Sequence, residues 1–206
     1  DLLARECKVI VAENEMKFDL IEPERGRFNW TRADDLVAFA ERNGMKVRGH
    51  NLVWHAQSDW ASKLNAGRDE MIAVMRAHIL AVAGRYRGKI LEWDVVNEAI
   101  DDGDDYLRDT FWRKAIGDDY IDLAFKFAHE ADPHALLFYN DYGGEGMNTK
   151  SDKIYRLVKD MLARGVPLHG VGIQCHFVAG EIDTAGIDTN IKRLAALGLK
   201  VSVTEL

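Results

Sequence analysis

Glutamates end two of the apolar runs in this chain. Glu98 closes a β-branched run that starts at Ile90, and Glu205 closes a second run that starts at Lys200. Such runs are typical of buried strands in a parallel sheet. A carboxylate at the end of a buried strand is costly to desolvate, so it must be hydrogen-bonded, exposed in a cleft or used for chemistry. Retaining cleavage of a glycosidic bond needs two carboxyl groups about 5–5.5 Å apart, one as acid/base and one as nucleophile.

A structural role is the alternative for each glutamate, because a single carboxylate at a strand end commonly forms a salt bridge. The two runs, however, place a polar residue directly before each glutamate: Asn97 precedes Glu98, and Thr204 precedes Glu205. This repetition favours one shared site over two unrelated salt bridges. Glu98 and Glu205 are therefore our candidate catalytic residues, and unequal surroundings must keep one protonated and the other ionised.

Polar residues also follow the other predicted strands. They are Asn14, Lys17, His50, Asn97, Asn140, Asp141, Gln174 and His176. Trp54 follows a strand end and is placed to stack on a sugar face, although a core position is its alternative. Loop capping is the alternative for the amides, and a hydrogen-bonded core position is the alternative for the histidines. The histidines lack the compact HExxH spacing, and the acidic run 101–105 lacks the EF-hand spacing, so no metal or other cofactor is predicted.

Strands and helices alternate along the chain. Strands are predicted at 8–12, 45–50, 93–98, 136–142, 171–174 and 200–205. Helices are predicted at 1–5, from Thr31 to a stop at Gly44, and at 69–85, 118–132, 151–164 and 188–197, where apolar residues recur at the helical period. Alternation of this kind predicts a parallel sheet, either a doubly wound open sheet or a (β/α)8 barrel.

The polar strand ends favour the barrel. In a barrel the carboxyl ends of all strands converge on one face, whereas an open sheet gathers only the residues near its switch point. In addition, no strand is followed by a glycine-rich turn of the GxGxxG or P-loop type, which weakens a nucleotide-binding interpretation. The sequence therefore predicts an α/β fold of the (β/α)8 type.

Composition narrows the classes of partner. A chain of 206 residues is long enough for one domain with a sizeable core, and we predict a single domain over 1–206. The net charge of -7 argues against nucleic-acid binding, because a phosphate backbone attracts basic surfaces. No apolar run is long enough to span a bilayer, so no membrane partner is predicted. Two widely separated cysteines define neither a disulfide framework nor an oligomeric state.

Six motifs, taken in order, resemble those of the family-10 glycoside hydrolases, the endo-β-1,4-xylanases. They are ENEMK at 13–17, GHNLVWH at 49–55, WDVVNEA at 93–99, NDY at 140–142, GIQCH at 172–176 and VTEL at 203–206. The resemblance covers almost the whole chain. It implies a (β/α)8 barrel that hydrolyses xylan or xylo-oligosaccharides with retention of anomeric configuration, and a secreted protein.

The resemblance also implies roles for individual residues. Glu98 would be the acid/base and Glu205 the nucleophile, with His176 hydrogen-bonded to Glu205. Asn97 would hold the 2-hydroxyl of the sugar at the cleavage point. The implied substrate-binding residues are Glu13, Asn14 and Lys17 in the neighbouring glycone subsite, and His50, Trp54, Gln174 and His176 around the cleavage subsite.

The length differs from that of the family. Compared with the eight βα units of the family's barrel, this chain has about six, which correspond to barrel strands 2–7. We therefore expect a catalytic domain that is truncated at both ends and has an open seam. Two interpretations of function stay open: an endo-xylanase, or a non-catalytic glycan-binding remnant of one. A third, another sugar- or phosphate-handling barrel, is weakened by the missing glycine-rich turn.

Overall fold

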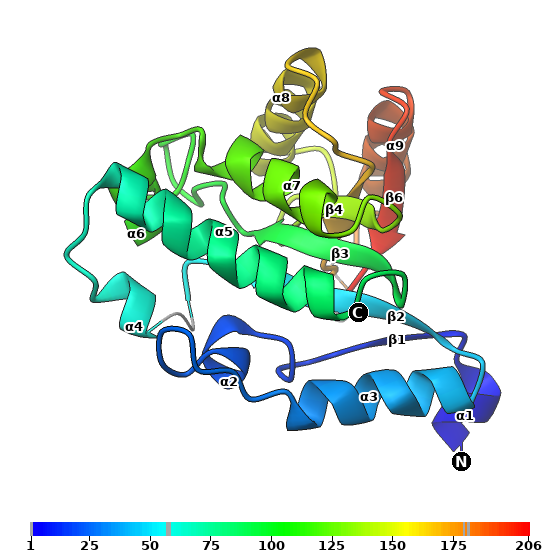
Figure 1. Cartoon of the computed structure of the whole chain (residues 1–206). Helices are drawn as coiled ribbons and strands as arrows, with labels where there is room; N and C mark the ends of the chain where they lie inside the picture. Colours follow the sequence, from blue (N-terminus) through cyan, green and yellow to red (C-terminus); the bar gives the residue numbers. More distant parts are fainter. Residues whose placement is uncertain (1, 57–58, 179, 181) are drawn as a thin grey trace.

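A single curved sheet forms the centre of the molecule. The computed structural model describes residues 2–56, 59–178, 180 and 182–206 (Figure 1). All six strands are parallel and pair in the order in which they occur in the chain. They are β1 (Val9–Val11), β2 (Lys46–Val53), β3 (Ile90–Asn97), β4 (Leu136–Asp141), β5 (Gly170–Ile173) and β6 (Lys200–Val203). The predicted alternation of helices with parallel strands is confirmed.

Five long helices connect the strands and cover the outer face of the sheet (Figure 1). They are α3 (Thr31–Arg42), α5 (Arg68–Arg85), α7 (Tyr120–Ala131), α8 (Thr149–Ala163) and α9 (Thr184–Ala195). Each buries one stripe; α7, for example, buries Ile121 and Phe125 while its opposite side stays in solvent. Four short helices complete the described chain: α1 (Leu2–Glu6), α2 (Phe18–Ile21), α4 (Asp59–Ser62) and α6 (Phe111–Ile116). Of the predicted first helix, Asp1 lies outside the described residues.

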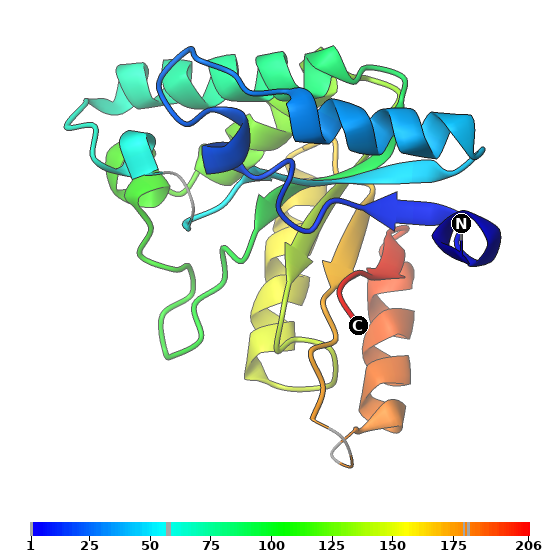
Figure 2. The same cartoon turned by 90° about the horizontal axis from the view of Figure 1, so that it is seen from below.

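The first and last strands of the sheet face one another without pairing (Figure 2). Val11 of β1 and Val203 of β6 are 40% and 54% exposed, although both belong to apolar runs. Residues of both strands line one pocket, together with Arg48 and Glu92. Within the described residues the sheet is therefore strongly curved and open along one seam.

Charged side chains occupy the inner face of this curved sheet. Arg48 of β2 forms a salt bridge of 2.6 Å with Glu92 and contacts both carboxylate oxygens of Asp94. Asp94 also lies 3.0 Å from Nδ1 of His50. Burial alone raises the pKa of Asp94, but Arg48 and His50 outweigh that effect and lower the pKa. Buried charges need such partners, so these contacts fix the side chains beneath the polar strand ends.

Candidate active site

The two candidate glutamates continue the hydrogen-bonding pattern of the sheet beyond its last strand residues. Glu98 directly follows β3, and its amide donates to the carbonyl of Asn140 at 2.9 Å. Glu205 lies two residues beyond β6, and its amide donates to the carbonyl of Gln174 at 3.1 Å. Because all six strands are parallel, both glutamates lie at the carboxyl edge of the sheet.

Three N–H groups hold the carboxylate of Glu98. The indole of Trp54 donates to Oε2 at 2.8 Å. The amides of Gln174 and Asn97 donate to Oε1 at 2.9 Å and 3.0 Å. Together these three contacts, from Trp54, Asn97 and Gln174, define the orientation of the Glu98 side chain.

Glu205 has a different set of partners. Nδ2 of Asn140 donates to its Oε1 at 2.8 Å, and Nε2 of His176 lies 3.2 Å from its Oε2. The same nitrogen of Asn140 donates to Oδ1 of Asn97 at 2.8 Å. Asn97 in turn contacts Glu98, so a continuous chain of side-chain amides joins the two glutamates. The contact of His176 with Glu205, which the family resemblance implied, is present.

A glycine makes room for the amide that joins the glutamates. A Cβ atom on Gly172 would lie 2.1 Å from Oδ1 of Asn140, closer than any real contact. That same oxygen accepts a hydrogen bond of 2.8 Å from the hydroxyl of Thr204. Small and polar residues next to the strand ends therefore place Asn140 between β3 and β6.

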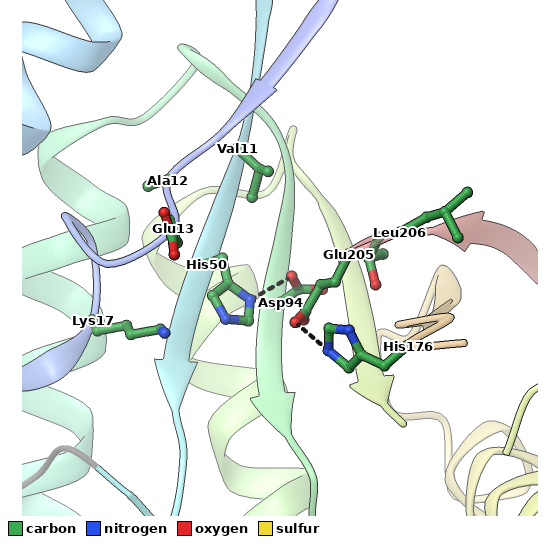
Figure 3. Close-up of a pocket in the computed structure, with 10 residues that line it drawn as sticks. Val11, Ala12, Glu13, Lys17, His50, Asp94, His176, Glu205 and Leu206 are labelled. Atoms are coloured by element: carbon green, nitrogen blue, oxygen red, sulfur yellow. Dashed lines mark hydrogen bonds and ion pairs between the residues drawn. The ribbon is translucent and has the colours of Figure 1, made fainter. Parts of the chain in front are cut away.

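A pocket of about 430 Å³ opens beside Glu205 (Figure 3). Glu13, Lys17 and His50 line one side of it, and His176 and Glu205 line the other. The ammonium group of Lys17 points into this space. It donates to Oδ1 of Asn14 at 3.0 Å and lies 5.1 Å from the centre of the Trp54 ring. The pocket and the hydrogen bonds to Glu98 thus bring all ten predicted site residues into one neighbourhood.

The acidic run 101–105 binds the ammonium group of Lys153. Nζ of Lys153 donates to the carbonyls of Gly103 and Asp105 at 2.5 Å and 2.6 Å. Among the residues that the structure describes, no three His, Cys, Asp or Glu side chains gather as a metal site would require. At the carboxyl edge of the sheet the structure places two carboxylates beside amide, imidazole and indole groups.

Known proteins are similar to this chain in sequence and in fold. The profile of glycosyl hydrolase family 10 matches residues 1–206. This chain belongs to glycosyl hydrolase family 10. Endo-1,4-beta-xylanase B of Paenibacillus barcinonensis is 44% identical over 100% of the chain and 64% of its own length. The family-10 chain therefore spans slightly less than two thirds of this relative.

Solved structures agree with the assignment. Native xylanase 10B from Thermotoga maritima is 41% identical with a TM-score of 0.96, covering 100% of this chain and 63% of that one. Xylanase 10B from Thermotoga petrophila, solved in complex with xylobiose, is 41% identical with a TM-score of 0.94, covering 97% of this chain and 61% of that one. The six strands are therefore an incomplete (β/α)8 barrel, as the sequence predicted.

Two residues of this candidate site were missing from the predicted set. Asn140 was recognised only as a polar strand end, yet it contacts Glu205 and Asn97. Asp94 lines the pocket and contacts His50, although it lies inside an apolar run. The available signal was the cost of burying an aspartate within such a run, which demands a partner from another strand.

Proposed function

We propose that this protein hydrolyses β-1,4-xylosidic bonds inside xylan chains, with retention of anomeric configuration. The observation that carries the proposal is the amide chain that joins Glu98 and Glu205 through Asn97 and Asn140. A retaining hydrolase needs its two carboxyl groups on opposite sides of one anomeric carbon, held at a fixed separation. Side chains locked to each other across two strands meet that need.

The two glutamates divide the chemistry between them. The carboxyl group of Glu98 gives its proton to the glycosidic oxygen while a carboxylate oxygen of Glu205 attacks the anomeric carbon. The bond to the leaving sugar breaks and a covalent glycosyl ester forms on Glu205. Glu98, now ionised, takes a proton from water, and the resulting attack releases Glu205 and restores the acid.

The neighbouring residues bind the sugar. Asn97 holds the 2-hydroxyl at the cleavage point, where contacts that strengthen in the transition state contribute most to rate. Glu13, Asn14 and Lys17 hold the adjoining sugar on the glycone side, with Lys17 pointing into the pocket. The remaining substrate-binding residues around the cleavage point are His50, Trp54, Gln174 and His176. Xylan is proposed as the substrate because the relatives are named xylanases and one was solved with xylobiose.

A glycan-binding role without turnover is the second candidate. It is favoured by the open seam, because β1 and β6 do not pair and the pocket is lined by Ala12 and Thr204, the residues that directly follow these two strands. Water and sugar then have free access, and the low-dielectric surroundings that strengthen catalytic electrostatics are weakened.

Activity measurements on two proteins separate these candidates. Reducing-sugar release from xylan is measured for the full-length protein and for residues 1–206 alone, at equal concentration. Endo-xylanase function predicts release by the full-length protein, and binding without turnover by 1–206 supports the second candidate for these residues. Absence of release by the full-length protein contradicts the first.

We also propose that the protein is secreted, because a polymer such as xylan is too large to reach an enzyme inside the cell. None of the helices in the described ranges has both the length and the apolar character needed to cross a membrane. Immunodetection of the protein in culture supernatant and in washed cells tests this proposal, and retention in the cells contradicts it.

A further inference from the structure

Glu98 has a backbone conformation that needs support. Its φ angle is +58°, in the left-handed region that residues with a side chain seldom adopt. A backbone held in this region is strained and persists only where its surroundings fix it. The contacts of the segment that follows Glu98 therefore decide where its carboxylate points.

One guanidinium group reaches back to this segment from the loop that follows it. Nε of Arg108 donates to the carbonyl of Glu98 at 3.0 Å, and its Nη2 lies 3.3 Å from the carbonyl of Ile100. The backbone amide of Arg108 also donates to the carbonyl of Ala99 at 2.8 Å. Arg108 thus contacts three consecutive carbonyl groups, beginning with that of Glu98.

A buried pair supports the same segment from the sheet. The hydroxyl of Tyr139 accepts hydrogen bonds from the amides of Ala99 and Ile100, at 3.0 Å and 3.1 Å. The hydroxyl itself donates to Asp141. Tyr139 therefore binds the backbone amides of the segment that follows Glu98, and Arg108 binds its backbone carbonyls.

The guanidinium of Arg108 is itself held by its neighbours. Its Nη2 donates to Asp102 at 2.8 Å and to the hydroxyl of Tyr142 at 3.0 Å. Asp102 also accepts from Tyr142 and from Lys150, each at 2.5 Å. Burial lowers the pKa of Arg108, but the hydrogen bonds with Asp102 and Tyr142 outweigh it and raise the pKa. The arginine stays charged and keeps one orientation.

We propose that Arg108 is a positioning residue for Glu98: it holds the left-handed backbone of Glu98 and so aims the carboxyl group at the glycosidic oxygen. This inference rests on the proposed function of Glu98 as acid/base. Arg108 touches neither the sugar nor the carboxylate in this account. Its effect on kcat/KM is confined to the first step, in which Glu98 delivers a proton, because the later step in which Glu98 takes a proton from water follows the covalent intermediate and enters kcat only.

A comparison of two substrates therefore distinguishes a positioning role from a merely structural one. Cleavage of a xylo-oligosaccharide needs a proton on the leaving oxygen, whereas a 2,4-dinitrophenyl xylobioside has a leaving group that departs without one. In the full-length protein, Arg108→Met should lower kcat/KM for xylotetraose by about 10–100-fold, because small misplacements of a catalytic group cost up to about 10². For the dinitrophenyl substrate we expect kcat/KM to fall by less than about threefold.

Two further variants complete the experiment. Arg108→Lys keeps a cation near Asp102 but cannot reach Asp102 and the Glu98 carbonyl together, so its loss should be intermediate and again selective for xylotetraose. Arg113→Lys is the matched control, since Arg113 donates to the carbonyl of Leu107 and to Asp118 without contacting Glu98. It should leave both substrates unaffected.

The outcomes distinguish this inference from the function on which it rests. Equal losses on both substrates, or no loss in Arg108→Met and Arg108→Lys, would overturn the positioning role while leaving the enzymatic function intact. If the unmodified full-length protein cleaves neither substrate, the proposed function fails and the inference fails with it. Thermal unfolding of each variant shows whether it is folded, and Arg108→Lys decides the matter if Arg108→Met is not.

Discussion

The side-chain nitrogen of Asn140 lies 2.8 Å from Oε1 of Glu205 and donates a hydrogen bond to it. Because the same nitrogen also donates to Asn97, the position of one candidate catalytic glutamate is tied to the residue beside the other. The amide sits where Gly172 leaves room for it. The spacing of the two glutamates is therefore a property of β3, β4, β5 and β6 together.

Asn140→Ala should lower kcat/KM for xylotetraose by about 10–100-fold, because a hydrogen bond to a charged group contributes about 1.5–3 kcal/mol. The matched control is Asn43→Ala, which removes an exposed amide at the end of α3. Steady-state kinetics of the full-length proteins provide the measurement. A loss below threefold in Asn140→Ala would mean that Glu205 does not depend on this contact.

Glu205→Gln should reduce turnover of xylotetraose by more than about 10³-fold, because an amide cannot form the glycosyl ester. The dinitrophenyl substrate should be affected equally, since every substrate needs the nucleophile. Glu130→Gln alters an exposed glutamate paired with Arg76 and should have no effect on turnover. Substantial hydrolysis by Glu205→Gln would show that another group is the nucleophile.

The buried His78 should make the fold sensitive to acid. Burial lowers the pKa of His78 below 6.5, outweighing its hydrogen bond to Glu22, and its Nε2 has no partner among the described residues. As the pH falls below about 6.5, the unfolded chain takes up a proton that the folded chain refuses. Stability is thus fully present above that pH and is lost as the pH decreases.

Urea unfolding of the full-length protein between pH 7 and pH 5 measures this loss, which cannot exceed about 1.4 kcal/mol per pH unit for one group. His78→Gln should have a smaller slope of stability against pH than the unmodified protein. His129→Gln removes an exposed histidine of α7 and should keep the full slope. An unchanged slope in His78→Gln would contradict the assignment of a neutral, buried imidazole.

Asp141 should make the fold less stable as the pH rises, the opposite of the effect of His78. Burial raises the pKa of Asp141 from 3.8 to about 6, although Lys150, 3.1 Å away, opposes the increase. Between about pH 4 and pH 6 the unfolded carboxyl ionises while the folded one keeps its proton, so this contribution to stability is lost as the pH rises. The shift corresponds to about 3 kcal/mol.

Asp141→Asn removes that titration, and the difference in unfolding free energy between variant and unmodified protein should change across pH 4–6. Asp104 is exposed, so Asp104→Asn serves as the control: its difference in unfolding free energy from the unmodified protein should stay constant across pH 4–6. A constant difference for Asp141→Asn across this range would mean that the pKa of Asp141 is not raised.

Strand order and the residues at strand ends were accessible from sequence because apolar runs and helical stripes are local patterns. Helix starts were less accessible: α9 begins at Thr184, not 188, because the side chain of Asp183 accepts from the amide of Gly186. The short helix α6 was not predicted, although its buried Trp112 donates to the carbonyl of Trp54 at 3.0 Å. Four to six residues are too few to show a helical period.

Residues that act across the fold were also missed, for a physical reason. Asn140 and Glu205 are 65 positions apart, and Arg48 and Asp94 are 46 apart, so no local window contains both partners. Arg108 lies in a loop, where charge alone does not distinguish a solvated side chain from one that holds a backbone carbonyl. The pairing of β2 with β3 brings Arg48 to Asp94, and the curvature of the sheet brings Asn140 of β4 to Glu205 beyond β6.

The anomer released first from a xylo-oligosaccharide tests the central claim most directly. Proton NMR of a reaction by the full-length protein, recorded before mutarotation, identifies that anomer. Two glutamates acting as acid/base and nucleophile invert the anomeric carbon twice, so the β-anomer should appear first and the α-anomer only later. Initial release of the α-anomer would show a single displacement by water and would contradict the roles proposed for Glu98 and Glu205.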